Sequence, residues 1–272
     1  MQHQRIAFIG GGNMASAIIG GLLKQGLAGS QIDVVEPAPE ARARLTGQFG
    51  VATHAAPDAA LAGANLVVWA VKPQTFREAA QQARPFTGSA LHLSVAAGIR
   101  SDSIAQWLGT ERVVRSMPNT PALIGKGITA LFARVAVSSA DRALVDSVVA
   151  TTGESLWVTE ESQLDAVTAL SGSGPAYVFY FIEAMTEAGA AMGLPREQAQ
   201  QLAVATFIGA GELARASDEA PVVLRQRVTS KGGTTYAAIT AMEQDDIKAQ
   251  FIRALQAART RARELGDEFG AG

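Results

Sequence analysis

The chain has 272 residues, of which 48% are hydrophobic and 18% are charged, and its formal net charge is −2. This length allows about two domains with buried cores, and the charge gives no basis for binding nucleic acid or an anionic membrane surface. Because the chain has no cysteine, we expect neither disulfides nor thiolate chemistry nor a cysteine-based metal site, and no metal overall. The sequence shows no secretory signal and no apolar run near the ~18 residues that span a bilayer, so we expect a cytoplasmic protein that does not enter a membrane.

The first 160 residues alternate short apolar runs with alanine-rich helical segments. This alternation predicts an α/β fold with a mostly parallel, doubly wound sheet covered by helices on both faces. The predicted strands are Ile6–Ile9, Ile32–Glu36, Leu66–Val71, Leu91–Val95, Val113–Ser116 and Leu156–Thr159. The predicted helices are Ala15–Gln25, Pro39–Gln48, Thr75–Ala83, Ser101–Leu108 and Ser139–Thr151.

The first predicted strand leads directly into a Gly-x-Gly-x-x-Ala motif that begins at Gly10, and a helix-compatible segment follows. This is the order of a dinucleotide-binding βαβ unit, in which a helix N-terminus offers N–H groups to a pyrophosphate. Gly10 permits the tight turn, Gly12 lets the backbone approach the phosphates, and Ala15 lets the helix pack on the strand. We therefore predict a Rossmann domain over residues 1–160.

Glu36 ends the second predicted strand, where an acidic side chain about 20 residues after the glycine motif typically accepts hydrogen bonds from the ribose 2′-hydroxyl of NAD. The same carboxylate would repel a 2′-phosphate. The alternative is a solvated residue in a Glu-Pro turn. Arg42 and Arg44 would partly offset the charge if they turned toward the ribose, so the choice between NAD and NADP stays open, with the local chemistry favouring NAD.

Three predicted loops follow strand ends, at Ala70–Pro73, Val95–Gly98 and Ser116–Pro121. In a doubly wound sheet these edges line the ligand crevice, and small residues such as Ala96 and Ala97 let a flat ring lie against the backbone. Ordinary turn chemistry explains each single loop about equally well.

After about Glu161 the sequence shows helical spacing and no convincing strand, which predicts an all-α domain over residues 161–272. The segment from Asp165 to Gly193 carries only three charged residues and is apolar nearly all round. Such a helix is usually buried on every side, so we predict that a second copy of the chain covers it in a dimer. Ser173 or Gly174 is predicted to cap a new helix within this segment.

Ser230 to Thr235 precedes a predicted helix at Tyr236–Glu243 and reads Ser-Lys-Gly-Gly-Thr-Thr. Two glycines at a helix start leave backbone N–H groups unobstructed, which predicts a cradle for a small carboxylate. A plain helix cap explains the serine and the threonines about as well.

The second half has no histidine and only two lysines, Lys231 and Lys248. An enzyme that makes or breaks an alcohol by hydride transfer needs a positioned acid–base group, usually histidine, lysine or tyrosine. A cyclic imine is protonated near neutral pH, so hydride addition to its C=N carbon requires mainly positioning. Tyr177, Tyr180 and Tyr236 remain as candidates, but Tyr177 and Tyr180 lie in the apolar segment and are expected to be core. The residues present therefore favour an imine over a ketone as hydride acceptor.

Over nearly its full length the chain resembles the pyrroline-5-carboxylate reductase family. The motifs that carry the resemblance are, in order, Phe-Ile-Gly-Gly-Gly-Asn-Met-Ala, Ala-Val-Lys-Pro-Gln, Ser-Val-Ala-Ala-Gly, Met-Pro-Asn-Thr-Pro, Leu-Ser-Gly-Ser-Gly-Pro-Ala-Tyr and Thr-Ser-Lys-Gly-Gly-Thr-Thr. The resemblance implies a Rossmann domain followed by an all-helical dimerisation domain, and reduction of 1-pyrroline-5-carboxylate to L-proline by NADPH or NADH, the last step of proline biosynthesis. It also implies dimers that often assemble into larger rings, up to a decamer.

Carried over residue by residue, the resemblance assigns the pyrophosphate to Gly10, Gly11, Gly12, Asn13, Met14 and Ala15. It places the nicotinamide half of the cofactor site at Ala70, Val71, Lys72, Pro73, Val95, Ala96 and Ala97. It maps the substrate pocket onto Ser230, Gly233, Thr234 and Thr235, with Thr235 as the catalytic hydroxyl that faces the ring nitrogen. Glu161 is also assigned to the substrate, with Glu160 beside it as the alternative.

The chain departs from the family pattern at two places. Pro57-Asp58 occupies the neighbourhood in which relatives usually carry an asparagine near the adenosine, and Arg227 stands where relatives often have asparagine. The Arg227 cation would either contact a cofactor phosphate or be solvated.

Two other classes of function stay open at the level of sequence. A β-hydroxyacid-type dehydrogenase has a similar layout but carries a catalytic lysine on its central helix, which this chain lacks. A nucleotide-sensing or scaffold protein would not need the carboxylate cradle at Ser230–Thr235.

Overall fold

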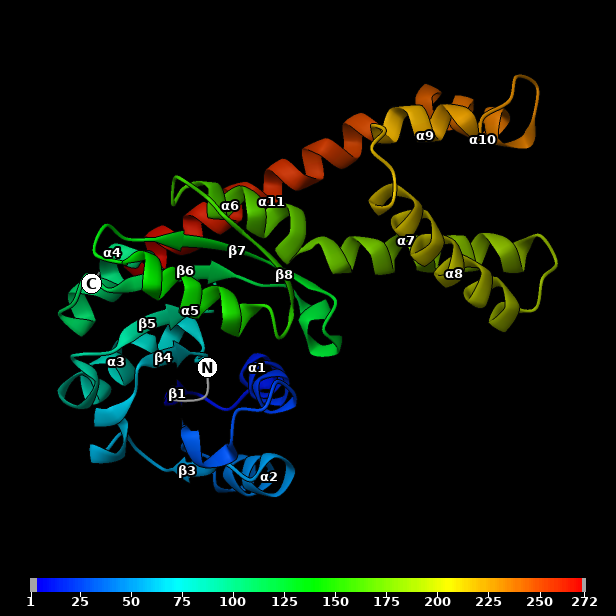
Figure 1. The fold of residues 1–272 in the computed structure, drawn as a ribbon. Coiled ribbons are helices and arrows are strands. Elements are labelled where there is room, and N and C mark those ends of the chain that lie inside the picture. The colour runs from blue at the N-terminus through cyan, green and yellow to red at the C-terminus, as the bar shows by residue number, and fades with distance from the viewer. Residues whose placement is uncertain (1–3, 271–272) are drawn as a thin grey trace. The chain divides into compact units, whose positions relative to one another are not determined.

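The computed structural model describes residues 4–270. Within these residues one sheet of eight strands forms, in the order β3-β2-β1-β4-β5-β6-β7-β8 (Figure 1). The strands are β1 (Ile6–Ile9), β2 (Ile32–Val35), β3 (Ala52–His54), β4 (Leu66–Trp69), β5 (Leu91–Ser94), β6 (Val113–Met117), β7 (Gly127–Ala133) and β8 (Gly153–Trp157). All neighbouring strands run parallel except β6 and β7. The doubly wound, mostly parallel sheet that the sequence predicts is therefore confirmed.

The central strands β1, β2, β4 and β5 are buried on both faces, because their successive residues point to opposite sides of the sheet and helices cover each side. In β1, Ile6 and Phe8 pack into the core formed with α1 (Asn13–Lys24), α2 (Pro39–Phe49) and α5 (Ser139–Val149). Ala7 and Ile9 pack into the opposite core, formed with α3 (Pro73–Thr87) and α4 (Ser101–Leu108). The continuous apolar strand sequences follow from this two-sided burial.

The predicted elements of the first half are confirmed with shifts at their ends, and two strands were missed. β3 has only three residues and carries polar Thr53 and His54, so it gives almost no periodic signal. β7 runs antiparallel to β6 and follows a 3₁₀ turn (Thr120–Ile124) instead of a crossover helix, so it lacks the βα alternation used for the prediction. The last strand was placed too late, because β8 begins at Gly153.

The rest of the chain is helical. It contains α6 (Gln163–Val167), a π-helical turn (Thr168–Gly172), α7 (Gly174–Ala191), α8 (Arg196–Arg215), α9 (Pro221–Arg227), α10 (Thr234–Gln244) and α11 (Ile247–Gly270). A new helix does begin within this segment, since α7 starts at Gly174. Of the two predicted caps, Ser173 is wrong, because it has helical dihedral angles (φ −84°, ψ −16°) and ends the π turn, and Gly174 is the first residue of α7. No helix between residues 4 and 270 is both long enough and apolar enough to cross a membrane.

The chain divides into two compact units, one formed by Gly174–Ala257 and the other by the remaining described residues. The end of α11, from Ala258, belongs to the same unit as the sheet. There a Cβ on Gly98 would lie 3.2 Å from Leu265 Cβ and 3.3 Å from Phe269 Cδ2, and Arg100 forms an ion pair with Asp267. The division into domains at residues 1–160 and 161–272 stays a prediction.

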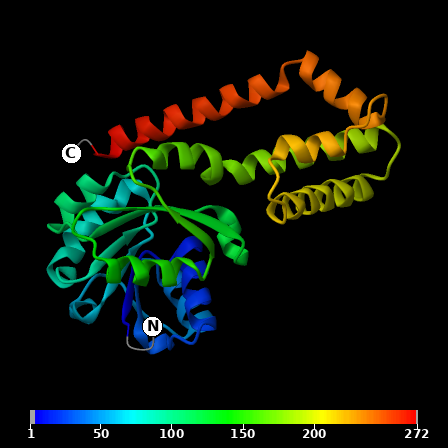
Figure 2. The same cartoon turned by 45° about the horizontal axis from the view of Figure 1, so that its top comes forward.

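In the other unit, α7 and α8 lie side by side (Figures 1 and 2) and bury little of their apolar surface. Among the described residues of α7, Thr186 and Gly189 are the buried ones, and the side chains of Phe179 and Tyr180 are 65% and 68% exposed. Ile208 on α8 is 62% exposed. Large exposed apolar surface of this kind marks an interaction site, as the predicted dimer requires.

Candidate cofactor site and substrate loop

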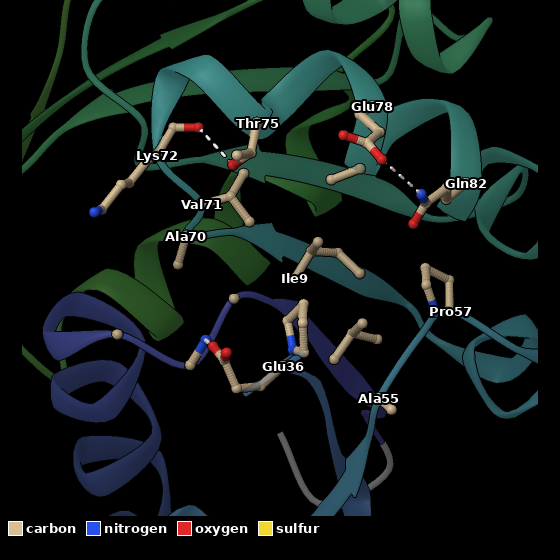
Figure 3. A pocket seen from close by; sticks show the side chains of 16 residues that line it. Ile9, Glu36, Ala55, Pro57, Ala70, Val71, Lys72, Thr75, Glu78 and Gln82 are labelled. Atoms are coloured by element: carbon tan, nitrogen blue, oxygen red, sulfur yellow. Dashed lines mark hydrogen bonds between the residues drawn. The ribbon is translucent and has the colours of Figure 1, made fainter. Parts of the chain in front are cut away.

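The carboxyl ends of β1, β2 and β4 meet at one edge of the sheet and open onto a cavity of about 560 Å³ (Figure 3). The glycine loop, the end of β2, the segment after β3 and the first turns of α3 form its walls. It is lined by Ile9, Gly10, Gly11, Gly12, Val35, Glu36, Pro37, Ala55, Pro57, Ala70, Val71, Lys72, Thr75, Glu78, Ala79 and Gln82. Doubly wound sheets bind their ligands at this edge.

The glycine loop fits a pyrophosphate. Gly10 has φ +95°, and a Cβ there would lie 2.6 Å from the carbonyl oxygen of Ala70, so only glycine is accommodated. Gly12 caps α1 and faces open space, since a Cβ built on it meets nothing within 4 Å. Phosphate oxygens can therefore reach the N–H groups at the start of α1. The first turn of α1 is formed by Asn13, Met14 and Ala15, whose side chains are not part of the cavity lining.

Glu36 reaches into this cavity from the residue after β2, where its carboxylate is already held by two backbone amides. Oε2 accepts a hydrogen bond from the N–H of Gly11 at 2.9 Å, and Oε1 accepts one from the N–H of Ala38 at 3.0 Å. The carboxylate is thus fixed beside the glycine loop, where the ribose of a bound dinucleotide would lie.

Neither arginine of α2 forms an ion pair with Glu36 among the described contacts. Arg42 donates to the backbone carbonyls of Glu36 (2.8 Å) and Pro37 (2.6 Å). Arg44 donates to the carbonyl of Gly11 at 3.0 Å. Both guanidinium groups are therefore engaged with the main chain around the cavity, and the negative charge of Glu36 is not cancelled by direct pairing.

The predicted nicotinamide residues fall into two groups. Ala70, Val71 and Lys72 line the cavity, and Pro73 is the first residue of α3. Val95, Ala96 and Ala97 follow the neighbouring strand β5 and do not line this cavity. They are held by their own contacts, in which the N–H of Val95 donates to Trp69 O at 3.1 Å and that of Ala96 to Ser94 Oγ at 3.3 Å.

Pro57 and Asp58, where the chain departs from the family pattern, have different surroundings. Pro57 lines the cavity, whereas Asp58 caps the 3₁₀ turn at Ala59–Gly63 by accepting the N–H of Ala60 at 2.8 Å. Asp58 Oδ2 also lies 3.1 Å from His54 Nδ1. The hydrogen bond from Ala60 and the nearby His54 hold the pKa of Asp58 below its usual value.

Glu161 is engaged within the sheet unit. Its Oε1 lies 2.9 Å from Arg115 Nη1 and accepts the N–H of Ser101 at 2.7 Å, and its Oε2 accepts the hydroxyl of Ser101 at 2.5 Å. The Arg115 side chain is 7% exposed and that of Glu161 is 23% exposed. The carboxylate thereby ties the segment after β8 to β6 and to the N-terminus of α4. Whether Glu161 also contacts substrate stays a prediction.

The predicted substrate loop lies in the helical unit and ends at Gly233, the N-cap of α10. Ser230, Thr234 and Thr235 are all exposed in the described chain. The N–H of Gly233 donates to Ser230 O at 3.0 Å, which folds the loop into a turn, and no described side chain caps α10. The first N–H groups of α10 are thus available to an anion, as the carboxylate cradle requires.

Arg227 ends α9 and donates to Glu219 Oε1 at 2.7 Å. This contact is an ion pair between residues that flank α9. The Arg227 side chain is also 66% exposed, as the solvated alternative requires, and a contact with a cofactor phosphate stays a prediction.

Most of the polar lining residues that the sequence does not predict are on α3. Thr75, Glu78, Ala79 and Gln82 line the cavity together because they lie on one face of the helix. These four residues are separated by three, one and three positions, which is the spacing of one helix face. With the helix start placed at Pro73, this spacing would predict that they face the cavity together.

Two families match the chain. Residues 161–265 match the family described as pyrroline-5-carboxylate reductase dimerisation, and residues 5–98 match the family described as NADP oxidoreductase coenzyme F420-dependent. The chain is 44% identical over 272 residues to pyrroline-5-carboxylate reductase of Pseudomonas aeruginosa, covering 99% of this chain and 100% of that protein. It is 39% identical over 273 residues to the enzyme of the same name from Haemophilus influenzae, covering 99% and 100%.

Solved structures of similar fold belong to the same family of enzymes. A pyrroline-5-carboxylate reductase from Coxiella burnetii is 38% identical, with a TM-score of 0.90 over 96% of this chain and 98% of that chain. A Plasmodium falciparum pyrroline carboxylate reductase solved with NADP bound is 27% identical, with a TM-score of 0.87 over 98% and 99%. The Rossmann unit, the helical part and the resemblance of the motifs are thereby confirmed. This chain belongs to the pyrroline-5-carboxylate reductase family.

Proposed function

We propose that this chain reduces 1-pyrroline-5-carboxylate to L-proline with NADPH or NADH, the last step of proline biosynthesis. The observation that carries the proposal is the 44% identity, along 99% of the chain, to the Pseudomonas aeruginosa enzyme of that name. The cavity at the glycine loop fits a dinucleotide, and the Ser230–Thr235 loop fits a small carboxylate.

The cofactor half of the site positions its ligand through backbone and charge. A bound NAD(P)H supplies the hydride that adds to the C=N carbon of the substrate. The open space at Gly12 admits the pyrophosphate to the N-terminus of α1. Glu36 would accept hydrogen bonds from the ribose of the adenosine. The backbone from Ala70 to Lys72 would contact the nicotinamide half of the cofactor.

The substrate half orients the imine. The N–H groups at the start of α10 bind the ring carboxylate, assisted by the positive end of the helix dipole. Ser230, Gly233 and Thr234 shape the cradle, and the Thr235 oxygen accepts a hydrogen bond from the protonated ring nitrogen. Because that nitrogen arrives protonated, the chain needs to hold the ring rather than to deliver a proton.

Glu161 has a different part in the proposal. Both of its oxygens already accept hydrogen bonds from Ser101 or Arg115, so Glu161 holds α4 and β6 in place within the sheet unit, and a direct contact with substrate is tested below.

The test of the proposed function follows the loss of NADH or NADPH absorbance with 1-pyrroline-5-carboxylate, with a 3-keto acid in a parallel assay. Turnover of the imine alone supports the proposal. Turnover of the keto acid alone would support a β-hydroxyacid-type dehydrogenase, and binding of the dinucleotide without turnover of either would support a sensing protein.

Self-association follows from the dimerisation family matched by residues 161–265. We propose a dimer that buries α7, with Phe179 and Tyr180 at its interface, and further assembly of dimers into a decamer. Light scattering after size-exclusion chromatography distinguishes monomer, dimer and decamer, and a monomer at micromolar concentration would refute the dimer. A cytoplasmic location stays a prediction, which cell fractionation tests.

A further inference from the structure

One end of the cofactor cavity carries polar groups that neither the pyrophosphate nor the ribose uses. The glycine loop and Glu36 account for those two parts of a dinucleotide. The remaining wall consists of Ala55 and Pro57 on one side, and of α3 with Glu78 and Gln82 on the other (Figure 3). A role for this end requires a bound dinucleotide and therefore rests on the proposed function.

The two polar side chains are joined in a defined way. Gln82 Nε2 donates a hydrogen bond to Glu78 Oε1 at 3.2 Å, one helical turn apart. The amide nitrogen must face the carboxylate, so the amide oxygen of Gln82 is left as an acceptor. The second carboxylate oxygen of Glu78 is also an acceptor. This part of the wall therefore presents acceptors to the cavity.

The opposite side of this end is apolar. Pro57 and Ala55 offer small, saturated surfaces against which a flat ring can lie, while the helix wall meets the edge of the ring. Adenine matches both properties, because its 6-amino group is a donor at the ring edge. Hypoxanthine has a carbonyl oxygen at that position, which would face the acceptors of Glu78 and Gln82 unfavourably.

We propose that Glu78 and Gln82 recognise the 6-amino group of the adenine, and that this pair makes the cavity selective for adenine dinucleotides over hypoxanthine dinucleotides. Glu36 determines the selectivity for the group at the ribose 2′-position, whereas Glu78 and Gln82 determine the selectivity for the base. Alternatively, Glu78 and Gln82 form an i, i+4 pair on the helix surface that stabilises α3 and does not contact the base.

The test uses isothermal titration calorimetry of the full-length protein with NADH and with deamino-NADH, in which hypoxanthine replaces adenine. No pyrroline substrate is present. We expect NADH to bind about tenfold more tightly than deamino-NADH, the range of a good pair of base-edge contacts. Because binding is measured directly, the result does not depend on the reaction, and absence of imine turnover would refute the proposed function alone.

Three variants separate recognition from a structural role. Glu78→Gln replaces an acceptor by an amide that can turn its NH₂ group toward the carbonyl of hypoxanthine, so the two affinities should come within about twofold. Gln82→Ala should narrow the difference by removing one acceptor. Gln81→Ala is the matched control, since Gln81 is exposed on the same helix and outside the cavity lining, and it should keep the native ratio.

Alanine and glutamine are good helix formers at these exposed positions, so α3 should stay folded, which circular dichroism checks. Equal affinities for the two dinucleotides in the native protein would overturn the proposal. So would a native ratio that survives both Glu78→Gln and Gln82→Ala, because a pair with a merely structural role would leave the ratio unchanged.

Discussion

The carboxylate of Glu36 and the backbone N–H of Gly11 are joined by a 2.9 Å hydrogen bond. One side chain therefore fixes the end of β2 against the glycine loop and places a negative charge in the cofactor cavity. The two effects can be separated, because the hydrogen bond needs an acceptor whereas exclusion of a 2′-phosphate needs the charge.

Substitution of Glu36 should change the choice of dinucleotide. Glu36→Ser removes the charge, so the ratio of kcat/KM for NADPH to that for NADH should rise by about tenfold or more, corresponding to ~1.4 kcal/mol of relieved repulsion. Glu36→Gln should give a similar rise while keeping an acceptor for Gly11. Glu40→Gln is the control, because Glu40 is exposed at the start of α2 and outside the cavity lining. An unchanged ratio in both Glu36 variants would show that this carboxylate does not face the ribose.

Removal of the Thr235 hydroxyl should slow the reaction without weakening cofactor binding. In Thr235→Ala, kcat should fall by about tenfold to a hundredfold, the loss of one well-placed hydrogen bond in the transition state. The KM for NADH should stay within about twofold of the native value, since the exposed hydroxyl is proposed to contact only substrate. Thr235→Ser keeps a hydroxyl and should recover most of the activity. Normal steady-state kinetics of the alanine variant would remove Thr235 from the site.

Loss of the Glu161 carboxylate should destabilise the sheet unit. Arg115 is 7% exposed, so Glu161→Ala leaves a buried cation without its partner, at a cost of about 3 kcal/mol in the free energy of unfolding. Urea denaturation followed by circular dichroism measures this cost. Glu160→Ala, one residue away and exposed, should lie within about 0.5 kcal/mol of the native protein. If Glu161→Gln folds and raises only the KM for the imine, Glu161 contacts substrate directly.

The buried His92 should make stability depend on pH. Its Nδ1 accepts a hydrogen bond from Trp69 Nε1 at 3.0 Å, and burial lowers the pKa of His92 to about 4 from 6.5. The unfolded chain takes up this proton near pH 6.5, whereas the folded chain stays neutral down to about pH 4. The free energy of unfolding therefore falls as pH is lowered from 6.5 to 4, by up to about 3 kcal/mol, and the His92 contribution is constant below that.

His92→Asn separates this effect from other titrations, since asparagine keeps an acceptor for Trp69 and does not titrate. Between pH 7 and pH 4 its stability should decline less steeply than that of the native protein, whatever its stability at pH 7. Parallel declines measured by denaturant titration would contradict the assignment.

The elements with strong local patterns could be predicted from the sequence. β1, β2, β4 and β5 are apolar on both faces, and Gly10 to Ala15 follows the first of them directly, so the sheet and the glycine loop were both foreseen. Glu36 lines the cavity, and its place there follows from the strand that precedes it, whereas its contact with the ribose stays a prediction.

The rest depended on contacts between distant segments. No local pattern shows that Ser101 and Arg115 both bond to Glu161, or that α3 turns Glu78 and Gln82 toward Pro57 and Ala55. For the same reason the sequence does not distinguish Val95–Ala97 from Ala70–Lys72, because both segments follow the end of a strand. Only Ala70–Lys72 lines the cavity.

The last turns of α11 belong to the same unit as the sheet. Leu265 and Phe269 lie beside Gly98, and Asp267 forms an ion pair with Arg100. During synthesis the ribosome delivers these residues only after the whole of the other unit, Gly174–Ala257, has been made. A nascent chain that has already formed the Rossmann sheet therefore lacks the cover over the loop after β5 until the end of α11 has been synthesised. A chain that stops before Ala258 would lack this cover, so the packing of the sheet unit depends on a segment that follows the whole of the other unit in the sequence.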